Sequence, residues 1–260
     1  MEIGCCAPME KYQAVSDAGY DYIELPGFQL AAYDFTLFKN FVQITNMVYL
    51  PVTRINSYCG SEPKIIGEGF DPKSIKDYAR GLMIKAEMLG VERVGIGSPK
   101  ARQLPEGFDL ALADEQCLEF LDITCREARD CGVEVLLEAV HPGYCNYINS
   151  TAKAVEMIER ANIKNLNLIL DLYNMKRSGE DWADIPKYLP FIKHMHISTD
   201  LGGLDRGLYS ESDRAELTET IKAIKDSGYK GTVSIEPSPD RIDLGSLTAS
   251  LKLMREIDKE

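Results

Sequence analysis

Four side chains of the kinds that bind divalent metal ions each end a short apolar run of the chain. The runs are VEVLLE, LNLILD, HMH and TVSIE, and they end at Glu138, Asp171, His196 and Glu236. Intervals long enough for a helix separate them. Carboxylate oxygens and imidazole nitrogens suit hard and borderline divalent ions. If the runs are parallel strands of one barrel, their carboxyl ends meet at one mouth, and the sequence predicts a metal site there.

The two faces of these runs differ in polarity. Side chains alternate across a strand, so residues of the same parity share a face. All four candidate ligands fall on one face, together with other polar residues such as Glu134. The other face is wholly apolar and consists of Val133, Val135, Leu137, Leu168, Leu170, Met195, Ile197, Val233 and Ile235. A fully buried parallel strand is normally apolar on both sides, so the polar face indicates a site rather than packing alone.

The elements that must position these residues alternate between strand and helix along the whole chain. Strands are predicted at Glu2–Cys6, Tyr22–Leu25, Val52–Ile55, Arg93–Ile96, Val133–Glu138, Leu166–Asp171, Ile192–His196 and Gly231–Glu236. Helices are predicted at Glu10–Ala18, Leu37–Val48, Pro72–Leu89, Asp114–Asp130, Thr151–Arg160, Asp181–Tyr188, Ala215–Ser227 and Gly245–Ile257. Eight such units in 260 residues favour an α/β protein with a single-domain (β/α)8 TIM barrel over residues 1–260.

Two further features narrow the fold and the site. Gly95-Ile96-Gly97 lacks the rest of a dinucleotide-binding fingerprint, and we expect a close turn at a strand end there. The long segments that follow predicted strands should carry the chemistry of a barrel. These segments are Pro26–Asp34, Asn56–Asp71, Ser98–Leu112, Ala139–Ser150 and Ser198–Asp213.

Composition excludes several classes of protein. A net charge of −12 argues against nucleic-acid binding, which needs clustered Lys and Arg. No apolar stretch is long enough to cross a bilayer, and the first residues lack the layout of a signal peptide. The seven cysteines form no CxxC pair, so reduced thiols in a cytoplasmic protein are expected. We expect Cys5 and Cys6 to be buried and inert.

Five short motifs, in order, resemble the sugar isomerase/epimerase superfamily, the xylose-isomerase-like TIM barrels. They are DAGYDYIEL with Glu24, LLEAVHPGYCNYINST with Glu138, LDLYNM with Asp171, HMHIS with His196 and SGYKGTVSIEP with Glu236. The layout is most similar to the ketose 3-epimerase and hydroxypyruvate isomerase-like branches. The resemblance implies that Glu138, Asp171, His196 and Glu236 bind one metal ion.

The resemblance also implies substrate contacts, and the chain departs from the family at two of them. Ketose 3-epimerases carry a histidine where this chain has Asn174, and a glutamate where it has Tyr144. Arg206 matches an arginine that the family places after the metal histidine. We take Glu24, His141, Asn174 and Arg206 as candidate substrate-binding residues.

Three carboxylates and one imidazole favour Mn²⁺, with Mg²⁺ or Co²⁺ as alternatives. Such an ion polarises a carbonyl and a neighbouring hydroxyl, which favours an enediolate. Glu138 and Glu236 are the expected acid/base pair that moves the proton next to the carbonyl. We expect His194, one layer deeper than His196, to be a hydrogen-bonded structural histidine.

The leading hypothesis is therefore a metal-dependent isomerase or epimerase of a small keto sugar. A dehydratase of a keto-inositol or of a 3-dehydroshikimate-like substrate is the main rival, because it starts with the same proton abstraction. The catalytic subunit of a C-glycoside-cleaving complex and a non-catalytic sugar-binding barrel are further alternatives. Lys100, Arg102 and Arg206 are the candidates for a phosphate clamp. A homo-oligomer is compatible with the sequence, whereas nucleic-acid and membrane partners are not expected.

Overall fold

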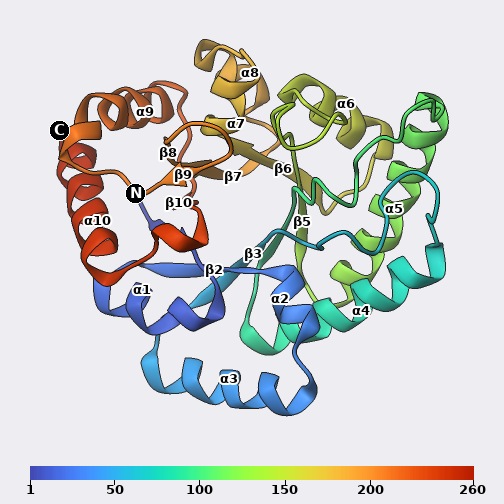
Figure 1. Ribbon diagram of the computed structural model, residues 1–260, viewed down its shortest axis with the longest axis horizontal. Coiled ribbons are helices and arrows are strands. Elements are labelled where there is room, and N and C mark those ends of the chain that lie inside the picture. Colours follow the sequence, from blue (N-terminus) through green and yellow to red (C-terminus); the bar gives the residue numbers. More distant parts are fainter.

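The computed structural model describes residues 1–260, and its centre is a closed barrel of parallel strands (Figure 1). The barrel strands are β1 (Ile3–Cys6), β2 (Tyr22–Pro26), β3 (Val52–Asn56), β4 (Arg93–Ile96), β5 (Glu134–Glu138), β6 (Leu166–Asp171), β7 (Ile192–Ile197) and β10 (Val233–Ile235). They follow one another around the ring in chain order, and β1 closes it by pairing with both β2 and β10. The predicted (β/α)8 barrel and its eight strands are thus confirmed.

Helices surround the barrel (Figure 1). They are α1 (Tyr12–Ala18), α2 (Gly27–Ala32), α3 (Phe35–Val48), α4 (Pro72–Leu89), α5 (Leu110–Asp130), α6 (Thr151–Ala161), α7 (Leu172–Arg177), α8 (Ile185–Tyr188), α9 (Arg214–Asp226) and α10 (Leu244–Lys259). Glycines end several of them, and Gly90 closes α4 in the left-handed conformation with φ 76°. None of the helices is both long and apolar enough to span a membrane.

The structure corrects the predicted elements at four places, all of them short. Helices α2 and α7, of six residues each, were not predicted, because a helix of this length offers too little apolar periodicity to detect. The segment predicted as one helix over Asp181–Tyr188 is a 3-10 turn, Trp182–Asp184, followed by α8. Within the expected loop Ser198–Asp213, strands β8 (Thr199–Asp200) and β9 (Arg206–Gly207) form an antiparallel ribbon.

Polar side chains point into the barrel below the mouth, as the parity of the strands predicted, together with the apolar Ile169, which fills the space beside Gly95. Tyr22 fills the interior beside β1, and the guanidinium carbon of Arg54 lies 4.4 Å from the centre of its ring. Gly4 makes this possible, because a Cβ at that position would come within 2.1 Å of the Tyr22 ring. The Tyr22 and Ser234 hydroxyls lie 3.1 Å apart. The outward strand faces, for example Val135 and Leu168, are buried in the hydrophobic core.

Candidate active site

The four residues singled out as metal ligands lie together at the carboxyl-terminal mouth of the barrel. Glu138 ends β5, Asp171 ends β6, His196 lies near the end of β7, and Glu236 directly follows β10. One oxygen or nitrogen atom of each lies within 4.8 Å of the corresponding atoms of the other three. Because neighbouring parallel strands end at the same level, four residues far apart in sequence form one cluster.

His196 presents one ring nitrogen to this cluster and the other to the protein interior. Its Nε2 lies 3.2 Å from both carboxylate oxygens of Glu24. Its Nδ1 is buried and has no hydrogen-bond partner, and it faces Glu138 Oε1 at 3.6 Å and Glu236 Oε2 at 3.4 Å. Metal-binding histidines commonly engage a carboxylate through their second nitrogen, which orients the ring. The unpartnered Nδ1 among carboxylates therefore fits a divalent ion.

Arg206 neutralises part of the negative charge of the cluster. Its guanidinium pairs with Glu236 Oε2 at 2.6 Å and with Asp171 Oδ2 at 2.8 Å. Its Nε donates to the Ser198 hydroxyl at 2.9 Å, and its guanidinium carbon lies 4.5 Å from the centre of the Tyr173 ring. Because three carboxylates share one arginine and one histidine, the mouth keeps the capacity to hold a further cation.

The surroundings of Glu236 and Asp171 shift the pKa values of these two carboxyl groups in opposite directions. Burial opposes the charge on Glu236, but Arg206 and His196 outweigh it and hold the pKa of Glu236 at about 2. Burial raises the pKa of Asp171 to about 6, with Glu138 and Glu236 adding to the effect and Arg206 opposing it. In the metal-free protein, burial also disfavours the charged form of His196, yet Glu24 and its other neighbours hold the His196 pKa well above its usual range. A metal ion would have to displace this His196 proton.

Asn174 joins the cluster from the first turn of α7. Its Nδ2 donates to Asp171 Oδ2 at 2.8 Å and to Glu138 Oε1 at 3.4 Å. Its Oδ1 accepts from the backbone N–H of His141 at 3.1 Å. Asn174 lies on the wall of the cavity, so the structure places this predicted substrate residue where substrate can reach it.

Two other predicted substrate residues lie behind the wall. His141 is buried, its Nδ1 accepts from the backbone N–H of Gly143 at 3.0 Å, and its ring centre lies 4.5 Å from that of Tyr144. Glu24 is fully buried between His196 and His194, whose Nε2 is 3.1 Å from Glu24 Oε2. Neither residue lines the cavity, so the expected direct contact with substrate does not match their positions. Both residues instead support residues that lie nearer to the cavity.

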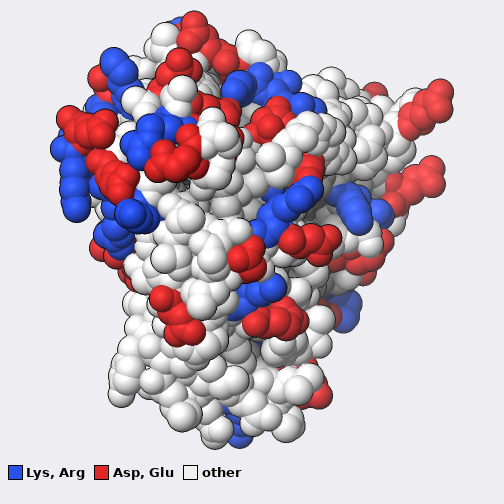
Figure 2. Space-filling model, turned by 60° about the vertical axis from the view of Figure 1, so that its left-hand side comes forward, with Lys and Arg blue, Asp and Glu red and all other residues white.

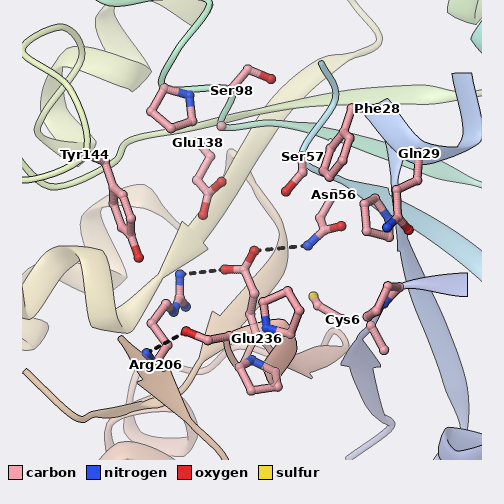
Figure 3. A pocket seen from close by; sticks show the side chains of 18 of the residues that line it. Cys6, Phe28, Gln29, Asn56, Ser57, Ser98, Glu138, Tyr144, Arg206 and Glu236 are labelled. Carbon is pink, nitrogen blue, oxygen red and sulfur yellow. Dashed lines mark hydrogen bonds and ion pairs between the residues drawn. The ribbon is translucent and has the colours of Figure 1, made fainter. Parts of the chain in front are cut away.

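A cavity of about 400 Å³ opens directly at the cluster (Figure 3). This volume lies within the range of about 300–1,000 Å³ typical of small-molecule sites. Glu138, Glu236 and Arg206 lie on its floor and sides, and Tyr144 and Phe28 approach it from opposite sides of the view in Figure 3. The cavity is large enough for a small sugar.

Sequence reasoning missed Asn56, the last residue of β3. Its Nδ2 donates to Glu236 Oε1 at 3.0 Å, so Asn56 and Arg206 hold the two oxygens of this carboxylate from opposite sides (Figure 3). The signal was available, because Asn56 is a polar residue that ends a strand, as Glu138 does. Cys6 also lines the cavity, 3.8 Å from His196 Nε2, and burial raises the pKa of its thiol, in agreement with the expected inert thiol.

The expected close turn at the end of β4 is present, because the backbone N–H groups of Ala101 and Arg102 donate to the carbonyl oxygen of Ser98. The structure gives Gly97 no left-handed backbone conformation. A Cβ at this position would lie 2.6 Å from Glu138 Oε2. The glycine is therefore needed because the Glu138 carboxylate occupies the space of a side chain.

Comparison with known proteins places the chain in a family. A family model described as the xylose isomerase-like TIM barrel matches residues 12–257. The inosose isomerase of Halalkalibacterium halodurans is 26% identical over 233 residues, which are 84% of this chain and 78% of that protein. The ketose 3-epimerase of Arthrobacter globiformis is 22% identical over 250 residues, which are 94% of this chain and 82% of that protein.

A solved structure agrees with the fold. The crystal structure of the IOLI protein with a binding zinc atom superposes with a TM-score of 0.76 at 18% identity, covering 100% of this chain and 98% of that one. The relatives are isomerases and epimerases, so the expected enzyme class is confirmed together with the fold. The protein belongs to the xylose isomerase-like TIM barrel family.

Proposed function

We propose that the protein is a divalent-metal-dependent isomerase or epimerase that moves a proton on the carbon next to the carbonyl group of a small keto sugar. The single observation that carries this proposal is the buried, unpartnered Nδ1 of His196, which faces Glu138 and Glu236 while Glu24 holds the other side of the ring. A structural histidine at full burial normally has both nitrogens hydrogen-bonded. An unpartnered nitrogen between two carboxylates indicates a place for a cation.

Glu138, Asp171, His196 and Glu236 would hold this ion. Three carboxylates and one imidazole suit Mn²⁺, which we propose as the ion, with Mg²⁺ or Co²⁺ as alternatives. The zinc atom in the IOLI protein supports a divalent ion on this fold. When bound, the ion would act as a Lewis acid on the carbonyl and the adjacent hydroxyl oxygen of the substrate.

The two glutamates are positioned to exchange protons with opposite sides of a substrate. β6 and β7 separate β5 from β10 in the ring, so Glu138 and Glu236 approach the cavity from different directions. Glu236 is ionised, with a pKa of about 2, and takes the proton from the carbon beside the carbonyl. The electron pair of that C–H bond forms the double bond of an enediolate, and the carbonyl oxygen takes up the negative charge. Glu138, which carries a proton in the complex with substrate, then delivers it to the opposite face or to the neighbouring carbon, and exchange with water restores both carboxyl groups.

The charges around the cavity favour a substrate without phosphate or carboxylate groups. Arg206 is the only cationic side chain on the wall, and both ends of its guanidinium already pair with Asp171 and Glu236. Arg102, a candidate for a phosphate clamp, is fully buried and donates to the carbonyl oxygen of Glu138 at 2.7 Å. We therefore propose a neutral keto sugar or keto-inositol as substrate.

The decisive experiment removes metal with a chelator, restores Mn²⁺, and follows a panel of keto sugars and keto-inositols by proton NMR in deuterated water. We expect metal-dependent entry of deuterium next to the carbonyl with the carbon skeleton intact. Glu236→Gln should abolish this exchange. The matched control Glu134→Gln alters the opposite end of the same barrel, and this variant should keep the exchange. Exchange that persists without metal or in Glu236→Gln would contradict the proposal.

A dehydratase is the second candidate, and Tyr144 is the observation that favours it. Its hydroxyl donates to the carbonyl oxygen of Leu204 at 3.2 Å at the edge of the cavity, and burial raises the pKa of the phenol, which keeps its proton. A protonated phenol at this position can assist a leaving hydroxyl group. The same NMR experiment detects this outcome as loss of water from a keto-inositol, and Tyr144→Phe should then slow it.

A further inference from the structure

Helix α3 is apolar on two faces, and only one of them packs against the protein. Phe38 and Phe41 are buried in the core. Leu37, Ile44 and Met47 lie on the other side of the helix and are 52%, 46% and 77% exposed. An apolar face of a helix normally packs against another element. We call these three residues, together with Asn40 between them, the α3 stripe.

The α3 stripe lies at the outer edge of the molecule and is not covered by another part of the chain. Helix α3 lies outside the ring of helices, at the bottom of Figure 1. Helix α4 contacts α3 and also carries exposed apolar residues, Ile84 and Met88. The segment that leads into α3 is fixed, because Lys85 Nζ donates to the carbonyl oxygens of Leu30, Ala31 and Tyr33 at 2.6–3.0 Å. The surface is therefore a fixed part of the fold rather than a loose helix.

The charge around the α3 stripe differs from that of the rest of the protein. The chain has a net charge of −12, yet residues 35–61 contain no acidic residue, and Lys39 is the only charged residue of α3. The lower end of the molecule in Figure 2 is correspondingly almost free of coloured atoms. Two strongly acidic molecules repel each other, and this repulsion is weakest where the surfaces that meet lack carboxylates. The end of the molecule that carries α3 is such a surface, because residues 35–61 lack carboxylates.

We propose that the α3 stripe binds the α3 stripe of a second copy of this chain across a two-fold axis. Leu37, Asn40, Ile44 and Met47 follow one another at intervals of three, four and three residues, which is the spacing of a helix-to-helix seam. A two-fold contact joins a surface to itself, and an amide suits this because it both donates and accepts hydrogen bonds. Asn40 can therefore pair with a polar group of the identical stripe and fix the register.

The charge of the surface that meets the α3 stripe distinguishes this partner from the other candidates. An anionic membrane or a nucleic acid presents dense negative charge and needs clustered cations, and Lys39 is the only cation that α3 offers to either. A second copy brings the same carboxylate-free surface. This inference is independent of the proposed reaction, because none of the stripe residues lines the cavity.

Sedimentation equilibrium of the full chain over a concentration series tests the proposal. We expect the wild type to reach twice its monomer mass of 29.1 kDa, and Ile44→Glu and Met47→Glu each to weaken the dimer by at least about 100-fold, because two copies of the new charge become buried. Asn46→Glu is the matched control. It places the same charge next to Met47 in sequence but on another side of α3, and it should leave the dimer intact.

Each other outcome overturns the inference. A wild type that stays monomeric at every concentration contradicts it, and so does a dimer that is as stable in Ile44→Glu and Met47→Glu as in the wild type. Circular dichroism of both variants checks that they are folded, so that loss of the dimer is not loss of the fold. Co-sedimentation of the wild type with vesicles of phosphatidylcholine and phosphatidylserine, lost in Met47→Glu, would assign the stripe to a membrane instead.

Discussion

His194 and His196 lie two residues apart on the same strand and face, but their surroundings differ. His194 has partners for both ring nitrogens, with Thr232 Oγ1 3.0 Å from Nδ1 and Glu24 Oε2 3.1 Å from Nε2. His196 shares Glu24 through Nε2 but leaves Nδ1 without a hydrogen bond among the carboxylates of the mouth. Burial lowers the pKa of His194 to about 4, whereas that of His196 is held high. The layer that contains His194 therefore has its hydrogen bonds satisfied and is structural, whereas the layer of His196, nearer the mouth, keeps a nitrogen free to bind a ligand.

The largest difference between the two layers should appear in turnover. Glu138→Gln or Glu236→Gln should lower the rate of deuterium exchange by about 10³-fold or more, because general acid/base catalysis typically contributes about 10²–10⁴-fold. His194→Gln, in the deeper layer, should change the rate by less than about tenfold. Exchange rates measured by NMR with saturating Mn²⁺ make the comparison. Equal losses in the two layers would remove the distinction between them.

Metal affinity should separate the two histidines directly. The side-chain amide of a glutamine can take the place of Nε2 but not of Nδ1, so His196→Gln should keep its contact with Glu24 and lose the metal ligand. We expect titration calorimetry with Mn²⁺ to show a loss of more than about 100-fold, beyond the effect of a residue that only supports a ligand. His194→Gln should bind Mn²⁺ almost normally and unfold about 1–2 kcal/mol more easily, because it loses the bond to Thr232. The reverse ranking would refute the assignment of the two residues.

Glu24 connects the two layers, and its replacement should affect both. Glu24→Gln keeps the shape of the side chain but removes the charge that orients His196. Changes in such supporting residues typically cost about 10–100-fold in metal affinity. We expect an effect of this size, measured by the same calorimetry, together with a lower melting temperature. Glu134→Gln, at the other end of the barrel, is the control, and unchanged affinity in Glu24→Gln would show that Glu24 is only structural.

The smallest expected effect is the dependence of metal affinity on pH. The pKa of His196 is raised, so one proton must leave when metal binds, and affinity should rise about tenfold per pH unit below the His196 pKa. Asp171 has a pKa of about 6 and is ionised above this pH, but below it a second proton competes with the ion. The slope of log affinity against pH should therefore steepen below about pH 6. A constant slope through pH 6 in the wild type would contradict the raised pKa of Asp171.

The strands and the four residues at the mouth were predictable because their signals are local. A strand can be recognised from a run of about five consecutive residues, and because side chains alternate along it, every second residue lies on the same face. Glu138, Asp171 and His196 each end or nearly end such a run, so the barrel topology alone brings them together. Helices α2 and α7 escaped detection because six residues hold too few apolar repeats.

The partners of these residues were decided only by the tertiary structure. Glu24 was expected to touch substrate, yet it lies beneath His196, which comes from a strand 172 residues further along the chain. Asn56 binds Glu236 across 180 residues. Nothing in the sequence around either residue specifies such a pair, because hydrogen-bond partners inside a barrel depend on the register and tilt of strands on different sides of the ring. The amino-acid sequence by itself therefore determined which side chains reach the mouth, and only the folded barrel decided which of them are saturated by neighbours and which remain free to bind a ligand.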